Sequence, residues 1–258
     1  MAVPGAFYDS GLKLDVPEDD ETQLDIAVLE KISDWANLTI ELAAVIMWLY
    51  GPAGAGKSII ARAMAEILKS RQQLLATFFF SRDDPSRNHI KSVIATLAYK
   101  ITLSVPESRP LITATIEKDP LIFHGPLEHQ FKELILEPLQ QLSLQGVTYP
   151  TIVILDGLDE CLHHEERTIL LRAISMAATQ YPMPLKFLIT SRPEAPITRT
   201  FNASPVNELS TQHCLCEDSL FVKPASPLNR ITCSFFFSTM AIPISLPANF
   251  RRGEGNLT

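Results

Sequence analysis

The residues of this chain whose types and spacing could do chemistry are concentrated in one turn. Gly51 is followed, after four residues, by Gly56, Lys57 and Ser58. Glycines allow the backbone to take positive φ and to approach a ligand closely, so that successive amide N–H groups can point at phosphate oxygens. A lysine placed here would contact the outer phosphates, and the serine hydroxyl would bind Mg²⁺. This is the spacing of the P-loop, and it predicts a phosphate-binding site.

The segments on either side of the turn are those that such a loop needs. An apolar run at 44–50 precedes it, and Ile60, Met64 and Leu68 follow it at helical spacing. The positive end of that helix would point at the bound anion. The alternative is an ordinary glycine-rich turn that connects a strand to a helix and binds no anion. The residues expected to contact a nucleotide are Gly51, Pro52, Ala53, Gly54, Ala55, Gly56, Lys57, Ser58 and Ile59.

A second group of candidate residues follows the apolar run at 151–155. This run is typical of a strand buried on both faces of a parallel sheet, and it leads into Asp156, Asp159 and Glu160. Ligands of open parallel sheets bind at the carboxyl ends of strands, so Asp156 can share a cleft with the P-loop. We expect Asp156 to hold Mg²⁺, and Asp159 or Glu160 to polarise an attacking water. The alternative is a solvent-exposed acidic turn.

Two arginines also follow β-type runs. Arg192 could reach the γ-phosphate and stabilise charge in the transition state, or it could simply end a strand before Pro193. Arg82 could contact the nucleotide in a similar way, but we expect it to pair with Asp83 or Asp84 instead.

The remaining periodicity predicts the elements that position these residues. Strand-like runs alternate with helical spacing, which indicates an α/β fold with right-handed crossovers and a sheet covered on both faces. Pro138 is expected to kink or restart the helix that contains it. The expected strands are 44–50, 74–81, 151–155 and 185–190, and the expected helices are 59–69, 90–101, 131–142 and 170–178.

Composition argues against several classes of function. The chain has 258 residues, 46% of them hydrophobic, which suffices for one α/β domain with appendages. The formal net charge of -7 and the lack of a basic run would repel a nucleic-acid backbone, so no nucleic-acid partner is expected. No apolar stretch reaches the roughly 20 residues that cross a bilayer, so no membrane partner is expected either. Four cysteines without framework spacing and no signal-peptide pattern indicate a cytoplasmic protein.

Four segments in a fixed order carry a family resemblance. They are WLYGPAGAGKS at 48–58, ATFFFSR at 76–82, IVILDGLDEC at 152–161 and LKFLITSRPE at 185–194. Together they resemble a fungal NACHT-type P-loop NTPase of the STAND class, close to the nephrocystin-like N-terminal domain. The resemblance covers about residues 25–216.

This resemblance implies a fold and a function. The fold is a five-stranded parallel sheet of order 5-1-4-3-2, with the sensor strand between the P-loop strand and the Walker B strand. The function is an ATP- or GTP-dependent switch with Mg²⁺, whose nucleotide state controls self-association or protein partners in signalling. By position, Gly51–Ser58 corresponds to Walker A, Asp156–Glu160 to an extended Walker B, and Arg192 to the sensor arginine.

Two parts of the chain differ from the family pattern. Glu18–Asp25 occupies the place of a cysteine, proline and threonine-arginine signature that normally precedes the first helix, so the contacts to the base are expected to differ. The segment after Cys216 matches neither the winged-helix module nor the C-terminal repeats of the family, which is the pattern of a truncated or alternatively assembled product. We therefore expect a linker and short helix at 1–39, a nucleotide-binding domain at 40–216 and an irregular tail at 217–258.

The leading hypothesis is a domain that binds Mg-NTP and hydrolyses it slowly. One alternative is a partner-binding scaffold without turnover, and another is a small-molecule P-loop kinase. The paired acids Asp159 and Glu160 suit activation of water better than phosphorylation of an acceptor, which favours hydrolysis over the kinase.

Overall fold

The computed structural model describes residues 2, 26–38, 44–181 and 185–215. The chain divides into two units, Met1–Ser219 and Leu220–Thr258, and all of the described residues lie in the first. The expected tail at 217–258 and the segment Glu18–Asp25 lie outside the described residues, so the expectations about them stay predictions.

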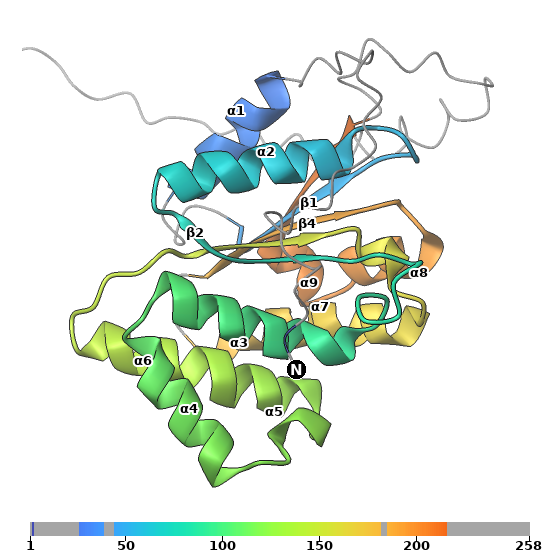
Figure 1. Ribbon diagram of the computed structural model, residues 1–258. Helices are drawn as coiled ribbons and strands as arrows, with labels where there is room; N and C mark the ends of the chain where they lie inside the picture. Colours follow the sequence, from blue (N-terminus) through green and yellow to red (C-terminus); the bar gives the residue numbers. More distant parts are fainter. Residues whose placement is uncertain (1, 3–25, 39–43, 182–184, 216–258) are drawn as a thin grey trace, which may run out of the picture. The chain divides into compact units, whose positions relative to one another are not determined.

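A five-stranded parallel sheet forms the centre of the described unit (Figure 1). Its order is β2-β3-β4-β1-β5, which is the predicted order 5-1-4-3-2 counted from the other edge. The prediction is therefore confirmed, including the position of β4 between β1 and β3. The strands are β1 Ile46–Tyr50, β2 Leu74–Phe79, β3 Ile152–Asp156, β4 Lys186–Ser191 and β5 Ser210–Cys214.

The burial of the strands follows their place in the sheet. Every residue of the central strands β3 and β4 is buried, as expected for strands covered on both faces. Edge strand β5 has the sequence STQHC, and only Cys214 in it is buried. A polar strand of this kind has no hydrophobic alternation, and for that reason the sequence pattern did not locate it.

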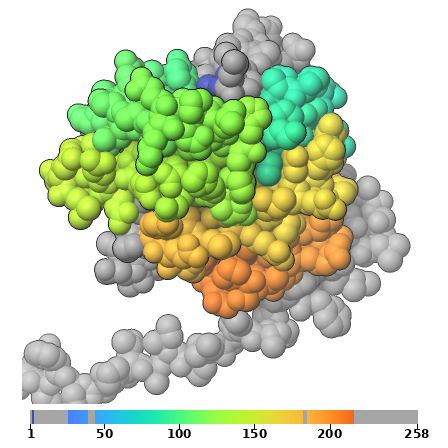
Figure 2. All heavy atoms as spheres, turned by 90° about the horizontal axis from the view of Figure 1, so that it is seen from below, coloured from blue at the N-terminus to red at the C-terminus, as the bar shows by residue number. Residues whose placement is uncertain are grey.

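Helices cover both faces of the sheet, as predicted (Figure 1). Helices α1 and α2 pack on one face against Met47, Leu49 and Leu188. The neighbouring positions Trp48 and Ile189 point to the other face, where α3, α5 and α7 enclose the larger core. Figure 2 shows the outer surface of that second face, where the helices drawn in green adjoin those in yellow and orange.

The helices match the predicted periodicity, and the structure adds shorter ones. Within the described ranges, every helix is too short or too polar to cross a membrane. The α-helices are α1 Ile26–Asn37, α2 Lys57–Ser70, α3 Val93–Ser104, α4 Ser108–Lys118, α5 Leu127–Phe131, α6 Glu137–Leu144, α7 His164–Gln180, α8 Ala195–Phe201 and α9 Val206–Leu209. Short helices of other types are η2 Ile90–Ser92, η3 Ile122–His124, η4 Lys132–Leu136 and η5 Leu158–Glu160.

Pro138 interrupts its helix as predicted. Residues Lys132–Leu136 form a π-helical turn between α5 and α6, and Pro138 lies in the first turn of α6. Proline has no N–H to donate to the carbonyl four residues earlier. The wider turn ahead of it lets the chain continue as a helix without that hydrogen bond.

A buried lysine attaches helix α1 to the sheet. Lys186, the first residue of β4, is 3% exposed, and its Nζ donates to the carbonyls of Trp35 at 2.8 Å, Ala36 at 3.1 Å and Leu38. These carbonyls are at the end of α1, where the helix provides no N–H partners. Burial lowers the pKa of Lys186. One side chain therefore satisfies the end of α1 and holds it beside the strand that precedes the sensor position.

Candidate functional site

The P-loop connects β1 to α2 at the carboxyl edge of the sheet. Gly54 has φ 78° and Gly56 has φ 76°, so both glycines take the left-handed conformation that the sequence predicts. Gly51 does not, and the prediction of a positive φ there is wrong. A Cβ atom at Gly51 would lie 3.2 Å from the Cβ of Leu215 and 3.3 Å from that of Ala55. Packing, rather than backbone conformation, therefore disfavours a side chain at position 51, because Leu215 and Ala55 would have to move by a few tenths of an ångström.

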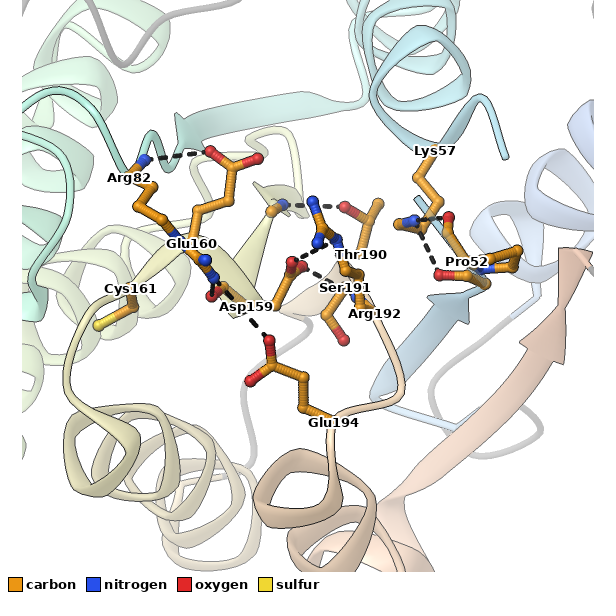
Figure 3. A network of polar contacts seen from close by, with 12 residues as sticks. Pro52, Lys57, Arg82, Asp159, Glu160, Cys161, Thr190, Ser191, Arg192 and Glu194 are labelled. Atoms are coloured by element: carbon orange, nitrogen blue, oxygen red, sulfur yellow. Dashed lines mark hydrogen bonds and ion pairs between the residues drawn. The ribbon is translucent and has the colours of Figure 1, made fainter. Parts of the chain in front are cut away.

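Lys57 is the first residue of α2, and its side chain turns back over the loop. Its Nζ donates to the carbonyl of Gly51 at 2.9 Å and to that of Pro52 at 2.7 Å (Figure 3). The amide of Gly51 donates to the carbonyl of Ser191 at 3.4 Å, which ties the loop to the end of β4. The ammonium group thus lies within the predicted phosphate cradle, held there by neutral acceptors.

The two predicted metal ligands lie near each other. The carboxylate of Asp156 accepts a hydrogen bond from the Thr190 hydroxyl at 2.6 Å, and the Ser58 hydroxyl lies near enough to favour its ionised form. Burial raises the pKa of Asp156, while these two hydroxyls and the positive charges of Arg62 and Lys57 act in the opposite direction. A hydroxyl and a carboxylate oxygen are hard ligands of the kind that Mg²⁺ prefers, so the residues present fit this cation.

Two further predicted residues, Asp159 and Arg192, form an ion pair. Asp159 Oδ1 accepts from the backbone amide of Arg192 at 2.9 Å, and Oδ2 lies 3.2 Å from Nε of its guanidinium (Figure 3). The Asp159 side chain is 4% exposed and that of Arg192 is 46% exposed. The structure therefore places the sensor candidate directly on one of the two acids expected to polarise water.

Glu160 lies beside this pair. Its Oε2 accepts from the backbone amide of Arg82 at 3.2 Å. Burial raises the pKa of Glu160, and the hydrogen bond from Arg82 only partly offsets this effect. A carboxylate with a raised pKa is suited to accept a proton from water.

The prediction that Arg82 pairs with Asp83 or Asp84 is wrong. Its Nη2 donates to the carbonyl of Asp159 at 3.1 Å and lies 3.9 Å from Oε1 of Glu194. Asp84 instead pairs with Arg87, with 2.7 Å between Nε and Oδ2. Proximity along the chain suggested the wrong pair because the end of β2 meets the loops after β3 and β4 in the folded sheet.

Three polar residues of the site were not found from the sequence. The Thr190 hydroxyl accepts from the amide of Gly157 at 2.9 Å while donating to Asp156, so it orients the acidic segment. Arg167 and Glu194 form an ion pair of 2.5 Å next to that segment. A threonine ending an apolar strand and an arginine in the first turn of a charged helix have the pattern of ordinary structural positions. The available signal was the position of Thr190 and Glu194 on either side of Arg192.

Comparisons with solved structures find distant similarity. A Drosophila ORC structure with poly(dA/dT) DNA and Cdc6 has 13% identity and a TM-score of 0.45, covering 74% of this chain and 28% of that one. The cytoplasmic domain of the Thermomonospora curvata type VII secretion ATPase EccC has 15% identity and a TM-score of 0.31, covering 62% of this chain and 18% of that one. The chain thus spans less than a third of the length of either.

Comparisons of sequence place the chain more firmly. No curated protein matches it. Residues 26–192 match the family described as Nephrocystin 3, N-terminal. The matched region contains the P-loop, the acidic segment and Arg192, and it spans more than half of the chain. The chain therefore belongs to the nephrocystin 3 N-terminal family.

Proposed function

We propose that this chain binds Mg-NTP, either ATP or GTP, and hydrolyses it slowly as the cytoplasmic switch domain of a signalling protein. We extend the proposal to the fungal NACHT type of the STAND class, with nucleotide state controlling protein partners or self-association. The observation that carries it is the convergence of Lys57, the neighbouring Ser58 and Asp156, and the Asp159–Arg192 ion pair at one edge of the sheet. They come from the ends of the neighbouring strands β1, β3 and β4.

Binding of the phosphates depends on the P-loop. In the proposed complex, Lys57 exchanges its contacts with two neutral carbonyls for charge-assisted contacts with phosphate oxygens. Amides of the loop and of the positive end of α2, such as those of Gly56 and Ser58, would point at the same anion, whereas the amides of Gly51 and Ala55 donate to the carbonyls of Ser191 and Pro52. Ser58 and Asp156 would hold Mg²⁺, which when bound neutralises phosphate charge.

Hydrolysis would use the acidic segment. Both carboxylate oxygens of Asp159 are engaged by Arg192, whereas Glu160 is held through Oε2 by a backbone amide. We therefore assign polarisation of the water to Glu160 and retention of Arg192 to Asp159. The water oxygen bonds to the γ-phosphorus, the bond from that phosphorus to the β,γ-bridging oxygen breaks, and the products are the nucleoside diphosphate, inorganic phosphate and a proton.

The Asp159–Arg192 pair would make turnover slow. A γ-phosphate would compete with Asp159 for the Arg192 guanidinium, whose side chain is 46% exposed. Until that exchange occurs, the arginine cannot stabilise charge on the transferred phosphoryl group.

The first test is nucleotide affinity. Fluorescent mant-ATP and mant-GTP are titrated against the wild type, Lys57→Ala and the control Lys69→Ala, with Mg²⁺ present. Lys69 is exposed at the far end of the same helix, so its loss should leave affinity unchanged. Lys57→Ala should weaken binding by roughly tenfold or more, because a charge-assisted contact is lost. Equal affinities for Lys57→Ala and the wild type would refute the proposal.

The alternative is a partner-binding domain without turnover. It is favoured by the occupied state of Arg192, because the pair with Asp159 keeps the arginine away from a phosphate. Phosphate release is measured for the wild type, Asp159→Ala and Glu160→Ala against a protein-free blank. Rates equal to the blank for all three proteins would support the scaffold and exclude hydrolysis.

A further inference from the structure

The side chain of Arg167 is an unusual feature of the core. It belongs to the first turn of α7 and is 2% exposed, yet it carries a full positive charge. Burial of an unpaired charge costs a great deal of free energy, so such a group persists only where every donor has a partner. Its partners therefore indicate what the residue holds in place.

Those partners all belong to the two loops of the candidate site. Arg167 Nε donates to the carbonyl of Cys161 at 2.8 Å, and Nη2 donates to the carbonyl of Asp159 at 2.7 Å. Nη1 lies 2.5 Å from Oε2 of Glu194. One planar guanidinium thus connects the acidic segment after β3 with the segment after β4.

These contacts close a ring with the Asp159–Arg192 pair. Asp159 is held through its carbonyl by Arg167 and through its carboxylate by Arg192. Glu194 is two residues beyond Arg192 and returns to Arg167. Arg82 adds a second donor to the same Asp159 carbonyl, at 3.1 Å. A shift of Arg167 would therefore change the position of Asp159 relative to Arg192.

We propose that Arg167 is a positioning residue that keeps the Asp159–Cys161 segment and Arg192 in register, so that Glu160 polarises water only when Arg192 is correctly placed. This inference rests on the proposed function. Arg167 acts through the backbone of the acidic segment and through Glu194. A lysine cannot replace it fully, because an ammonium group lacks the planar fork that reaches two carbonyls and a carboxylate at once.

The test compares Arg167→Lys with a control on the same helix. Arg172 is exposed and lies outside the ring, so Arg172→Lys should behave as the wild type. Arg167→Lys should lower kcat for NTP hydrolysis by roughly tenfold, because misplacement of a reacting group by about 1 Å can cost up to about 100-fold. KM should change less than about twofold, since the P-loop contacts that dominate binding are untouched. Glu194→Gln, which keeps the shape but removes the charge, should lower kcat by about threefold.

A double-mutant cycle separates positioning from general stability. In the Arg192→Ala background, Arg167→Lys should have little further effect on kcat, because the register that Arg167 maintains between the acidic segment and Arg192 no longer affects the rate. Additive losses in the cycle would overturn the inference, as would a KM that rises with kcat unchanged. Thermal unfolding is recorded for each variant, and Glu194→Gln replaces Arg167→Lys if the latter does not fold.

A second readout does not require turnover. The ratio of affinities for mant-ATP and mant-ADP, or for the guanine pair, reports whether Arg192 senses the γ-phosphate. This ratio should fall in Arg167→Lys, within the limit of about twofold expected for KM, and an unchanged ratio would overturn the inference. A wild type that binds neither triphosphate refutes the proposed function itself, whereas a wild type that binds and discriminates while Arg167→Lys matches it refutes only the role of Arg167.

Discussion

The P-loop and the acidic junction of Asp159, Arg167, Arg192 and Glu194 are built in different ways. Lys57 reaches carbonyls five and six residues earlier in the chain, and the loop closes within one turn. In the junction, Asp159 and Arg192 are 33 residues apart, and Arg167 and Glu194 are 27 apart. The lysine contacts of the first region form within the loop, although the Gly51 amide also donates to Ser191 of β4, whereas the second region exists only when β3 and β4 lie side by side. Local contacts thus prepare the phosphate site, and long-range contacts prepare the chemistry.

The largest expected effect comes from Asp156, which interacts with Ser58 of the P-loop and with Thr190 of β4. Asp156→Asn keeps the acceptor for Thr190 but removes the charge that would hold Mg²⁺. Phosphate release should fall on the order of 100-fold. The free energy of unfolding at neutral pH should stay equal or rise, because burial raises the pKa of Asp156 and its ionised form is costly in the fold.

Chemical denaturation of both proteins checks the second part of this prediction. A large loss of stability in Asp156→Asn would show that the carboxylate is a structural group. It would contradict the distinction between the P-loop and the acidic junction.

Two lysines test the comparison directly. Lys186 donates to carbonyls about 150 residues away in the chain, whereas the hydrogen bonds from Lys57 to the carbonyls of Gly51 and Pro52 are local. Lys186→Met should lower the free energy of unfolding by about 1–3 kcal/mol, because the carbonyls at the end of α1 lose their donor. It should leave affinity for mant-nucleotide unchanged. Lys57→Ala should weaken nucleotide binding and leave the free energy of unfolding unchanged. Equal losses of stability in both variants would contradict the distinction between local and long-range contacts.

The pH dependence of hydrolysis addresses Glu160. Burial raises its pKa above the ordinary value of 4.5, and the residue must be ionised to polarise water. The hydrolysis rate should therefore fall on acidification at a pH above 4.5, and this acid limb should disappear in Glu160→Gln, which retains a low rate. Mg²⁺ and nucleotide affinity are measured over the same range, since protonation of Asp156 would weaken Mg²⁺ binding and lower the rate for that reason. An acid limb that persists unchanged in Glu160→Gln would assign it to another group.

The smallest expected effect belongs to a local ion pair. Hydrogen bonds from Ser86 and Arg87 lower the pKa of Asp84 from 3.8 to about 2. Stability from this group is therefore present above pH 3.8 and is lost as the pH falls through about 2. The Asp84 side chain is 34% exposed and solvent screens its charge, so Asp84→Asn should cost only about 0.5 kcal/mol at pH 7. Denaturant titrations at pH 7 and pH 2.5 measure this, and no reduction of the difference at pH 2.5 would contradict the assignment.

The sequence alone determined the features that depend on short-range pattern. The spacing of Gly51, Gly56 and Lys57 predicted the P-loop, and the apolar runs predicted four strands and the helices between them. These features are local because backbone conformation and burial of a regular element follow from residues a few positions apart. The resemblance to a known family supplied the strand order, which the structure confirms.

Tertiary structure decided which polar side chains meet. Arg82 contacts Asp159 and Glu194 rather than its neighbours in sequence. Leu215 packs closely against Gly51. Arg167 lies at the centre of the junction, where it donates to the Asp159 carbonyl. The hydrophobic pattern of the sequence did not predict strand β5, because this edge strand is polar and shows no hydrophobic alternation. The physical reason is common to these cases. Parallel strands bring their carboxyl ends to one edge, and the partners that meet there are set by strand order and register rather than by distance along the chain.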